Sequence, residues 1–563
     1  MNDAWMTDGT GHPRRWAILG VLVVSLLVVV LDNTVLNIAL PTIQADLKAT
    51  PAELVWAVDS YILTFAALLF TWGVIGDRVG RKRVLIIGLV VFAIASAICA
   101  FSVNAGMLIG FRAIMGIGGA AVLPTTLAII TVVFPPHERG KAIGAWAGAV
   151  GAAVALGPVI GGLLLQHPEW SRWLTGNDWG AVFLINVPIV AIGLVLISRI
   201  VPETRNPAPR RLDLVGLVIS VLGLVLLIYG IIDASRTRDW LAPSVIWPIL
   251  AGLVVIGLFL WWEHRSDHSS FDVSLFTNRG YAVSLVAVSL AFFALSGITF
   301  TLPFYLQILR GFDTLTAGLC FIPFAVGQLL AAPRSAAMVL KFGYRLVMTT
   351  GLVLVALSLL ALTQLTIDAP LWMLLVGFFI FGFGMGNVIA PASTVMQNVL
   401  PLARAGAGSA VQNTVRQVGG ALGIAIIGTL LATQYATTIT PVFAEAGLPD
   451  SVVDLASESI IATDAVLDQV SAPAAVVEQV RAQAYEVFLD ASHLTYYVSF
   501  AIVVIAALVV AFALPRIAPP RKEGPPPEDS AVDSLVAREV RDYPEQLAEE
   551  LPPITPPSRA SDS

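Results

Sequence analysis

The chain has 563 residues, of which 57% are apolar and only 12% charged, and its mean hydropathy is +0.83. This charged share is about half that of a typical soluble domain, so a soluble enzyme is excluded. The net charge of −6 gives no support to nucleic-acid binding. Both cysteines, Cys99 and Cys320, fall within apolar runs, which indicates neither a disulfide scaffold nor a zinc site.

Apolar runs of about 20 residues recur along most of the chain, and each is long enough as a helix to cross a hydrocarbon layer of roughly 30 Å. Only helices suit such runs, so the predicted fold class is an all-α polytopic membrane protein with about fourteen spans. The expected spans are 16–40, 54–75, 84–103, 107–133, 142–165, 181–200, 213–232, 244–262, 281–303, 315–334, 346–366, 371–399, 407–432 and 493–515.

The distribution of basic residues predicts the orientation of these spans. An even number of spans places both termini on one side of the membrane. Of the 32 Lys and Arg residues, 24 fall in the connecting segments on that side and six on the other. The positive-inside rule therefore predicts that both termini of this multi-pass protein are cytoplasmic, in the inner (plasma) membrane.

Glycine and proline positions recur at an offset of 266 residues, which indicates two homologous halves. Parallel repeats with a site between them near the bilayer midplane are a common transporter plan. We expect a cytoplasmic N-terminus at 1–15, a six-helix bundle at 16–201, a linker with two extra transmembrane helices at 202–280, and a second bundle at 281–515. The second bundle includes a long acidic external loop at 433–492, and a Pro-rich disordered tail follows at 516–563. The matching pairs are Gly116 and Gly382, Gly118 and Gly384, Pro135 and Pro401, Gly140 and Gly406, Gly157 and Gly423, and Gly162 and Gly428.

Three ionisable residues lie at similar depth in the outer half of the first bundle: Asp32, Asp59 and Arg112. An ionised side chain at the bilayer centre costs roughly 2.5–3.5 kcal/mol on insertion scales, so a functional role is the default interpretation. A carboxyl group balanced between burial and a nearby Arg suits a proton carrier. The alternative is a static ion pair that only orients the helices.

Polar residues on two other spans predict a watery cavity. Gln412, Asn413 and Arg416 share one face of the thirteenth span, and Asn33 and Asn37 form a stripe on the first. These side chains are candidates for contact with a substrate. Alternatively, Arg416 binds carbonyl groups at a helix kink and the asparagines only link helices.

Two glycine-containing motifs indicate gating and close helix packing. In GVIGDRVGRKR (73–83), Gly73 and Gly80 permit a tight turn, Asp77 suits a helix N-terminus, and Arg78 and Arg81 belong to a basic anchor. The basic group could also be a topology signal alone. In GPVIGG (157–162) a proline kink is combined with small residues at Gly157, Pro158, Gly161 and Gly162.

Several strings together resemble the major facilitator superfamily, in its fourteen-span drug:proton antiporter branch. They are LDNTVLNIALP (31–41), GVIGDRVGRKR, LIGFRAIMGIGGAA (108–121), GPVIGG and WGAVFLINVP (179–188). The resemblance implies that Asp32 and then Asp59 handle protons or cations, that Arg112 assists proton transfer, and that Asp77 belongs to a cytoplasmic gate between the halves. It also implies that Gly157 and Pro158 form the kink of exporters. The chain departs from the pattern at Met115, Ala153 and Gly180, and its second-half loop near Lys341 lacks the acid.

The absence of a GxxxxGK[ST] phosphate loop indicates that an ion gradient supplies the energy. We expect a proton-coupled exporter of small lipophilic compounds, cationic or amphipathic, that works by alternating access. Its partners are these substrates, protons and membrane lipids; a monomer without cofactor, metal or nucleic acid is expected. One alternative is a dedicated exporter of a single endogenous metabolite, antibiotic or lipid, and a remote one is a non-transporting receptor or scaffold.

Overall fold

Helices are the only regular elements in the described part of the chain, which comprises residues 11–205, 213–265, 276–398, 405–445, 450–469 and 474–516 of a computed structural model. Residues 1–517 form one unit, and the helices below all belong to it. The second unit, residues 518–563, contains nearly all of the predicted disordered tail and lies outside the described residues.

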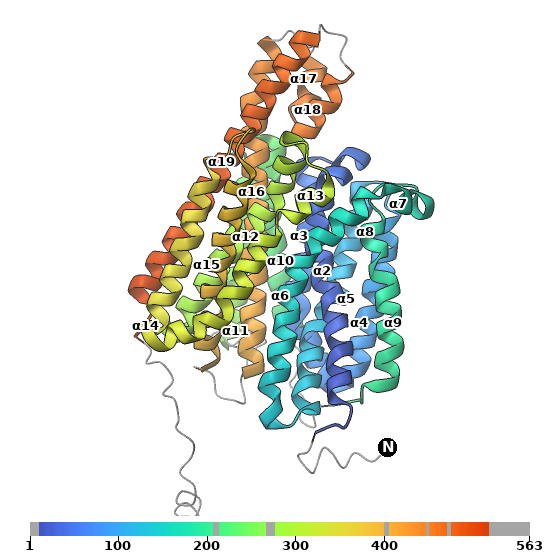
Figure 1. The fold of residues 1–563 in the computed structure, drawn as a ribbon, viewed down its shortest axis with the longest axis vertical. Coiled ribbons are helices and arrows are strands. Elements are labelled where there is room, and N and C mark those ends of the chain that lie inside the picture. The colour runs from blue at the N-terminus through green and yellow to red at the C-terminus, as the bar shows by residue number, and fades with distance from the viewer. Residues whose placement is uncertain are drawn as a thin grey trace, which may run out of the picture. The chain divides into compact units, whose positions relative to one another are not determined.

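The first half contains the helices up to residue 200. Local sequence explains where several of them begin: Thr50 and Glu53 form a capping box at the start of α3, and the Asn104 side chain accepts a hydrogen bond from the amide of Met107 at the start of α5. Gly80, with φ +123°, separates α3 from α4. The helices are α2 (Arg15–Leu47), α3 (Pro51–Val79), α4 (Arg81–Ala100), α5 (Ala105–Val133), α6 (Pro136–Gln166), the short α7 (Pro168–Thr175) and α8 (Ala181–Leu184), and α9 (Asn186–Ile200) (Figure 1).

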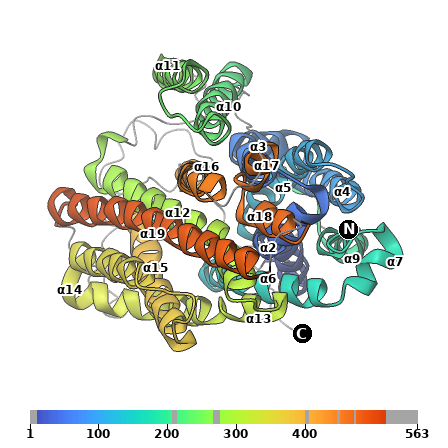
Figure 2. The ribbon, with the colours of Figure 1, turned by 90° about the horizontal axis from the view of Figure 1, so that it is seen from above.

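The second half follows an inserted hairpin of two helices, α10 (Leu214–Thr237) and α11 (Pro243–Arg265). Viewed from above, this hairpin lies at one side, next to α3 (Figure 2). The second half consists of α12 (Arg279–Phe304), the π-helical segment η2 (Tyr305–Leu309), α13 (Thr314–Leu319), α14 (Ile322–Leu362), α15 (Leu371–Asn398), α16 (Ala405–Glu445), α17 (Asp450–Ala456), α18 (Ile460–Leu467) and α19 (Ala474–Ala513).

Within the described residues, twelve helical segments are long and apolar enough to cross a membrane. One of them, Thr314–Leu362, contains a break at Gly343, where φ is +80° and ψ is 160°. Large apolar side chains cover the outer surface of the inserted hairpin; Trp247 of α11, for example, is 69% exposed. Such a surface is suited to lipid, so the chain is a membrane-spanning, all-helical protein.

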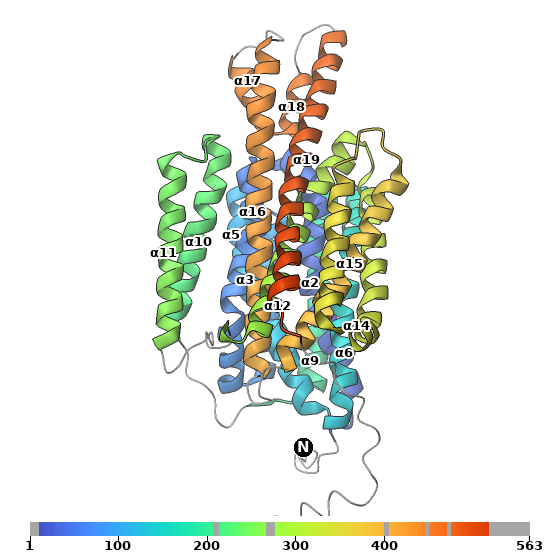
Figure 3. The same cartoon turned by 90° about the vertical axis from the view of Figure 1, so that its left-hand side faces the viewer.

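The segment 433–492, expected to be an external loop, is largely helical where it is described. α16 and α19 are 41 and 40 residues long and extend past the other helices, with α17 and α18 beside their ends (Figures 1 and 3). The hydroxyls of Tyr435 and Thr463 are 2.5 Å apart, which joins α16 to α18. Where it is described, the expected loop therefore consists of extensions of the long helices α16 and α19, with the short helices α17 and α18 between them in the chain.

The repeated glycines occupy equivalent packing positions in the two halves. A Cβ atom at Gly116 of α5 would lie 2.4 Å from the backbone oxygen of Tyr61 in α3, and one at Gly382 of α15 would lie 1.9 Å from that of Phe324 in α14. At Gly118 and Gly384 the nearest atoms are again backbone oxygens of the adjacent helix, both at 2.6 Å. The offset of 266 residues therefore reflects the same close helix crossings made twice.

Candidate functional site

A buried ion pair joins α2 to α5 inside the first half. Arg112 Nη1 donates a hydrogen bond to Asp32 Oδ2, and the two side chains are 0% and 1% exposed. Arg112 Nε also donates to the backbone oxygen of Ala57 at 3.1 Å, and its guanidinium carbon lies 4.3 Å from the centre of the Tyr61 ring. The structure thus brings Asp32 and Arg112 together as predicted, and Arg112 also bridges to α3.

The second oxygen of Asp32 is held by a residue that sequence reasoning did not single out. Asn186 Nδ2, at the start of α9, donates to Asp32 Oδ1 and to Ser96 Oγ, both at 3.0 Å. Ser96 Oγ in turn donates to the backbone oxygen of Phe183. An asparagine within an apolar run was the available signal, because a buried amide needs partners.

Asp59 has a different environment from Asp32. It is 0% exposed, and neither of its carboxyl oxygens has a hydrogen-bond partner among the described residues. Arg112 Nη2 is likewise without a hydrogen bond within that part of the chain. Burying a carboxyl group without compensating partners is costly, so a functional role for Asp59 is the default interpretation.

In the second half, Arg416 lies on α16 and stacks on an aromatic ring. Its guanidinium carbon is 5.0 Å from the centre of the Phe292 ring of α12, and its Nε has no hydrogen-bond partner within the described ranges. Gln412, one turn earlier, donates to Ser393 Oγ of α15 at 2.6 Å. Gln412, Asn413 and Arg416 are all half-buried.

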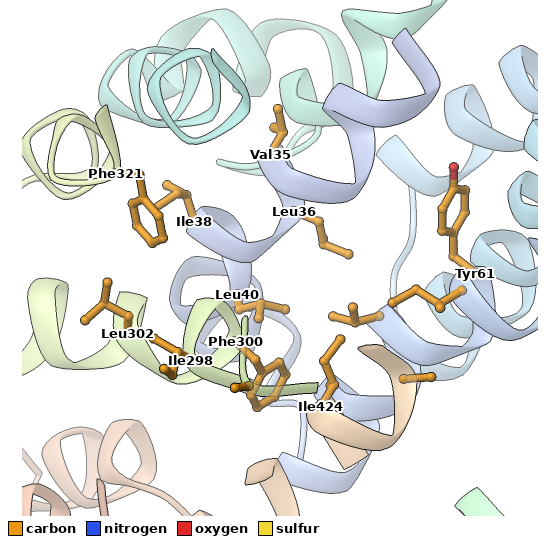
Figure 4. Close-up of a cluster of buried hydrophobic side chains, with 14 of the residues drawn as sticks. Val35, Leu36, Ile38, Leu40, Tyr61, Ile298, Phe300, Leu302, Phe321 and Ile424 are labelled. Carbon is orange, nitrogen blue, oxygen red and sulfur yellow. The ribbon is translucent and has the colours of Figure 1, made fainter. Parts of the chain in front are cut away.

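The two asparagines of α2 lie beside an apolar contact between the halves. Asn33 and Asn37 are half-buried, and the side-chain oxygen of Asn37 lacks a hydrogen bond from any described residue. Nearby, Val35, Leu36, Ile38 and Leu40 of α2 are drawn in the same cluster as buried side chains of α12 and α16 and as Phe321, which directly precedes α14 (Figure 4). Gln307 Nε2 donates to the backbone oxygen of Ile38 at 2.9 Å, which adds a polar link between the halves.

The GPVIGG motif of α6 forms part of the same contact between the halves. A Cβ at Gly157 or Gly161 would meet Thr34 or Val35 of α2, and one at Gly162 would lie 2.3 Å from the backbone oxygen of Thr314. From the other side, a Cβ at Gly318 of α13 would lie 2.2 Å from the backbone oxygen of Pro158. These small residues therefore allow α6 to touch both α2 and the second half.

The glycine-rich motif at 73–83 lies where α3 ends and α4 begins, at the end of the first half opposite to the contact between α6 and α13. Arg81 donates from Nε and Nη2 to Asp77 Oδ1 at 2.9 and 2.8 Å, one helical turn away, and from Nη1 to the backbone oxygen of Ala128. A Cβ at Gly80 would lie 2.5 Å from Glu203 Oε1, whereas Gly73 has ordinary space around it. Asp77 is thus paired within its own half.

Among the described residues, no group of three or more His, Cys, Asp or Glu side chains could hold a metal ion. Both cysteines are buried and form no disulfide bond. What the site offers is therefore a set of buried ionisable groups next to a contact between two bundles. Buried ionisable groups within membrane-spanning helices commonly mark substrate or ion pathways.

Comparison with known proteins identifies the class. Residues 22–424 match the Major Facilitator Superfamily. The chain is 34% identical over 504 residues to the multidrug efflux pump LfrA of Mycolicibacterium smegmatis, an alignment covering 89% of this chain and 97% of LfrA. It is 32% identical to the tetracenomycin C resistance and export protein of Streptomyces glaucescens, over 77% of this chain and 79% of that protein. It is also 32% identical to the methyl viologen resistance protein SmvA of Salmonella typhimurium, over 76% and 84%.

Solved structures give the same fold. A bacterial homolog of the human lysosomal transporter Spinster, in an inward-facing and occupied conformation, superposes with a TM-score of 0.65 at 15% identity, covering 90% of this chain and 98% of that one. The xylose transporter XylE of E. coli superposes with a TM-score of 0.52 at 16% identity, over 89% and 97%. The chain belongs to the major facilitator superfamily and is a transporter, not an enzyme.

Proposed function

We propose that the chain is a proton-coupled exporter of small lipophilic compounds, cationic or amphipathic, that works by alternating access. The observation that carries the proposal is the buried Asp32–Arg112 pair, held by Asn186 beside the contact between the halves. Burying a charged pair in this position has a large desolvation cost, and a role in proton coupling would explain why the pair is present.

The contacts around Asp32 support a specific coupling step. A proton on Asp32 Oδ2 removes the negative charge that holds Arg112 Nη1 and so weakens the link between α2 and α5. A cationic substrate near Asn33 and Asn37 would compete with that proton for the same carboxylate. Asp59, buried without a hydrogen bond from the described residues, supplies a second carboxyl group.

The contacts between α6, α2 and α13 support closure of one end of the pathway. Three contacts between the halves lie near the end that carries α17 and α18. Gln307 of η2 contacts Ile38 of α2, and α6 and α13 pack closely at Gly162 and Gly318. With both termini cytoplasmic, as the basic residues predict, this end is external. The conformation is then closed to the outside, and the gate containing Asp77 lies at the cytoplasmic end. We propose that the protein acts in the plasma membrane as a monomer.

We further propose fourteen membrane spans, which places the chain in the drug:proton antiporter branch. The break at Gly343 divides the Thr314–Leu362 segment into two spans, and the 31-residue α6 is a further one. Twelve spans form the two bundles, and α10 and α11 are the inserted pair. Reporter fusions at Gly311 and Gly343 test this directly, since fourteen spans require these two positions to lie on opposite sides.

The names of the relatives favour two substrate ranges. One relative is a multidrug efflux pump and another a methyl viologen resistance protein, which supports broad export of organic cations. The tetracenomycin C export protein supports the second candidate, a dedicated exporter of one antibiotic or other endogenous compound. Growth assays against unrelated toxic cations separate them, because a dedicated exporter protects against few compounds.

The central experiment is dye efflux from vesicles that contain the purified protein, driven by an imposed pH gradient. Asp32→Asn, Asp59→Asn and Arg112→Ala should each abolish the pH-driven component. Asp178→Asn is the matched control, because Asp178 also pairs with an arginine, Arg172, but at an exposed position. Efflux that continues unchanged in Asp32→Asn and Asp59→Asn, or without any pH gradient, would show that the proposal is wrong.

A further inference from the structure

A cavity of about 300 Å³ lies outside the site described above, between the inserted hairpin and the two bundles. Four helices line it: α3 of the first half, α16 of the second, and α10 and α11 of the hairpin. The hairpin lies at the edge of the protein next to α3 and α16 (Figures 2 and 3). The volume of the cavity is at the lower end of the range for small-molecule pockets, about 300–1,000 Å³.

The walls of this cavity are almost entirely apolar. Its lining comprises side chains such as Leu224, Ile256 and Phe259, together with three hydroxyl-bearing residues, Thr71, Ser220 and Thr414. The opposite surfaces of α10 and α11 carry large exposed apolar side chains, which places the hairpin between the cavity and lipid. An occupant of this space must therefore have a lipophilic body of modest size.

One end of the cavity is acidic. Glu263, which is only 2% exposed, belongs to the lining. Asp213 lies close by: a Cβ atom at Gly216, another lining residue, would be 2.5 Å from Asp213 Oδ2 and 2.8 Å from Glu263 Oε1. Two carboxyl groups at one end of an apolar chamber favour a positive charge there and disfavour a negative one.

The positions of Asp213 and Glu263 along the hairpin indicate how deep in the membrane the acidic end of the cavity lies. Asp213 caps the N-terminus of α10, and Glu263 precedes Arg265 at the end of α11, so both lie at the end of the hairpin that the positive-inside rule assigns to the cytoplasm. A molecule with an apolar body and one positive charge, dissolved in the inner leaflet, would align with the cavity in this way. No residue of the Asp32–Arg112 network lines it.

From this geometry we propose that the cavity is a second binding site, specific for amphipathic organic monocations. It accepts them from the inner leaflet, with the charge at Glu263 and Asp213 and the apolar body between α3, α10 and α16. Its role as a staging site for export rests on the proposed function, whereas binding itself does not.

The test uses the full-length protein in nanodiscs with tetraphenylphosphonium as the probe and tetraphenylborate as its anionic isostere. Binding is measured by equilibrium dialysis in an Asp32→Asn background, which removes the carboxylate of the central site. We expect tetraphenylphosphonium to bind at least about tenfold more tightly than tetraphenylborate in that background. Glu263→Gln, which is nearly isosteric, should weaken tetraphenylphosphonium binding by about tenfold.

Filling the cavity provides an independent test. Ser220→Trp places a large side chain inside the cavity. Val218→Trp places the same side chain on the opposite surface of α10, where Val218 is 63% exposed. Ser220→Trp should abolish the binding and Val218→Trp should preserve it. Binding that survives Ser220→Trp, binding that is not weakened by Glu263→Gln, equal binding of the borate, or no binding in the Asp32→Asn background would each overturn the proposal. None of these outcomes concerns pH-driven efflux, whose persistence in Asp32→Asn and Asp59→Asn would instead refute the proposed proton coupling.

Discussion

The two halves of the chain pack alike but differ in what they bury. Gly116 and Gly382 make the same close crossing, and so do Gly118 and Gly384. Four residues before Gly116 the first half has Arg112, whereas four residues before Gly382 the second half has Phe378, whose ring lies 5.5 Å from that of Phe321. The repeat therefore sets the architecture, and the buried Asp32–Arg112 pair has no counterpart at the equivalent position of the second half.

The largest effect is expected when the first half is given the residue of the second. Arg112→Phe leaves Asp32 buried without its cation, which should lower the free energy of unfolding by about 3–5 kcal/mol and abolish pH-driven efflux. Thermal unfolding of the purified protein and vesicle efflux measure the two effects.

A double variant distinguishes the loss of charge from the loss of fold. Asp32→Asn combined with Arg112→Phe removes both charges, so most of the stability should return while transport stays absent. Equal instability of the single and double variants would contradict the assignment of the cost to the unpaired carboxylate.

A smaller effect is expected at the repeated glycines, and it should be the same in both halves. Gly116→Ala and Gly382→Ala each force a methyl group against a backbone oxygen of the neighbouring helix, which should cost about 1–3 kcal/mol of stability. Gly110→Ala on α5 is the control, because a Cβ there has nothing within 4 Å. A large difference between Gly116→Ala and Gly382→Ala in thermal unfolding would show that the crossings are not equivalent.

The link between the halves should respond more modestly. Gln307→Leu removes the hydrogen bond to the backbone oxygen of Ile38, which should favour separation of α2 from η2 by about 0.5–1.5 kcal/mol. Distances between spin labels at Lys48 and Leu319, in a background without the native cysteines, should then populate longer values. An unchanged distance distribution would show that this bond does not hold the two halves together.

The smallest effect concerns the helices between α16 and α19. Burial raises the pKa of Glu458, against a smaller lowering by Arg238, and burial also raises the pKa of Asp464. A carboxyl group with a raised pKa in the folded state favours folding at low pH, and this contribution is lost as the pH rises through the folded-state pKa.

Amide exchange of residues 450–469, corrected for its intrinsic pH dependence, should therefore be slower near pH 4 than near pH 8. Glu458→Gln should reduce this difference, and Glu458→Gln with Asp464→Asn should remove most of it. If the double variant keeps the full pH dependence, other groups are responsible.

The sequence predicted an all-helical membrane protein correctly, because a run of about 20 apolar residues has few alternatives in lipid. The described residues contain twelve candidate spans, and the count of fourteen stays a prediction. It also predicted Asp32, Asp59 and Arg112 as buried ionisable groups, but spacing alone could not tell which acid contacts Arg112. Asn186 was not singled out because, unlike Asn33 and Asn37, it has no second polar residue one helical turn away.

The segment after residue 433 was harder to predict, since the apolar signal of the thirteenth span stops there while α16 continues to Glu445. Glu263 was overlooked for a related reason. It falls just after the predicted span 244–262, in a position that resembles an ordinary interfacial acid, and only the packing of four helices encloses it. Tertiary contacts of this kind leave no periodic trace in one sequence.

The inserted hairpin leans on both halves, since α10 packs against α3 and α16 alike. At its far end, Arg238 donates from Nη2 to Ser457 Oγ at 2.8 Å, and Thr433 of α16 donates to the backbone oxygen of Ala234. These hydrogen bonds tether the hairpin to the second bundle. If the bundles rock as the proposed alternating access requires, the hairpin should travel with α16 and slide over α3, so that each turnover would change the volume of the cavity beneath it.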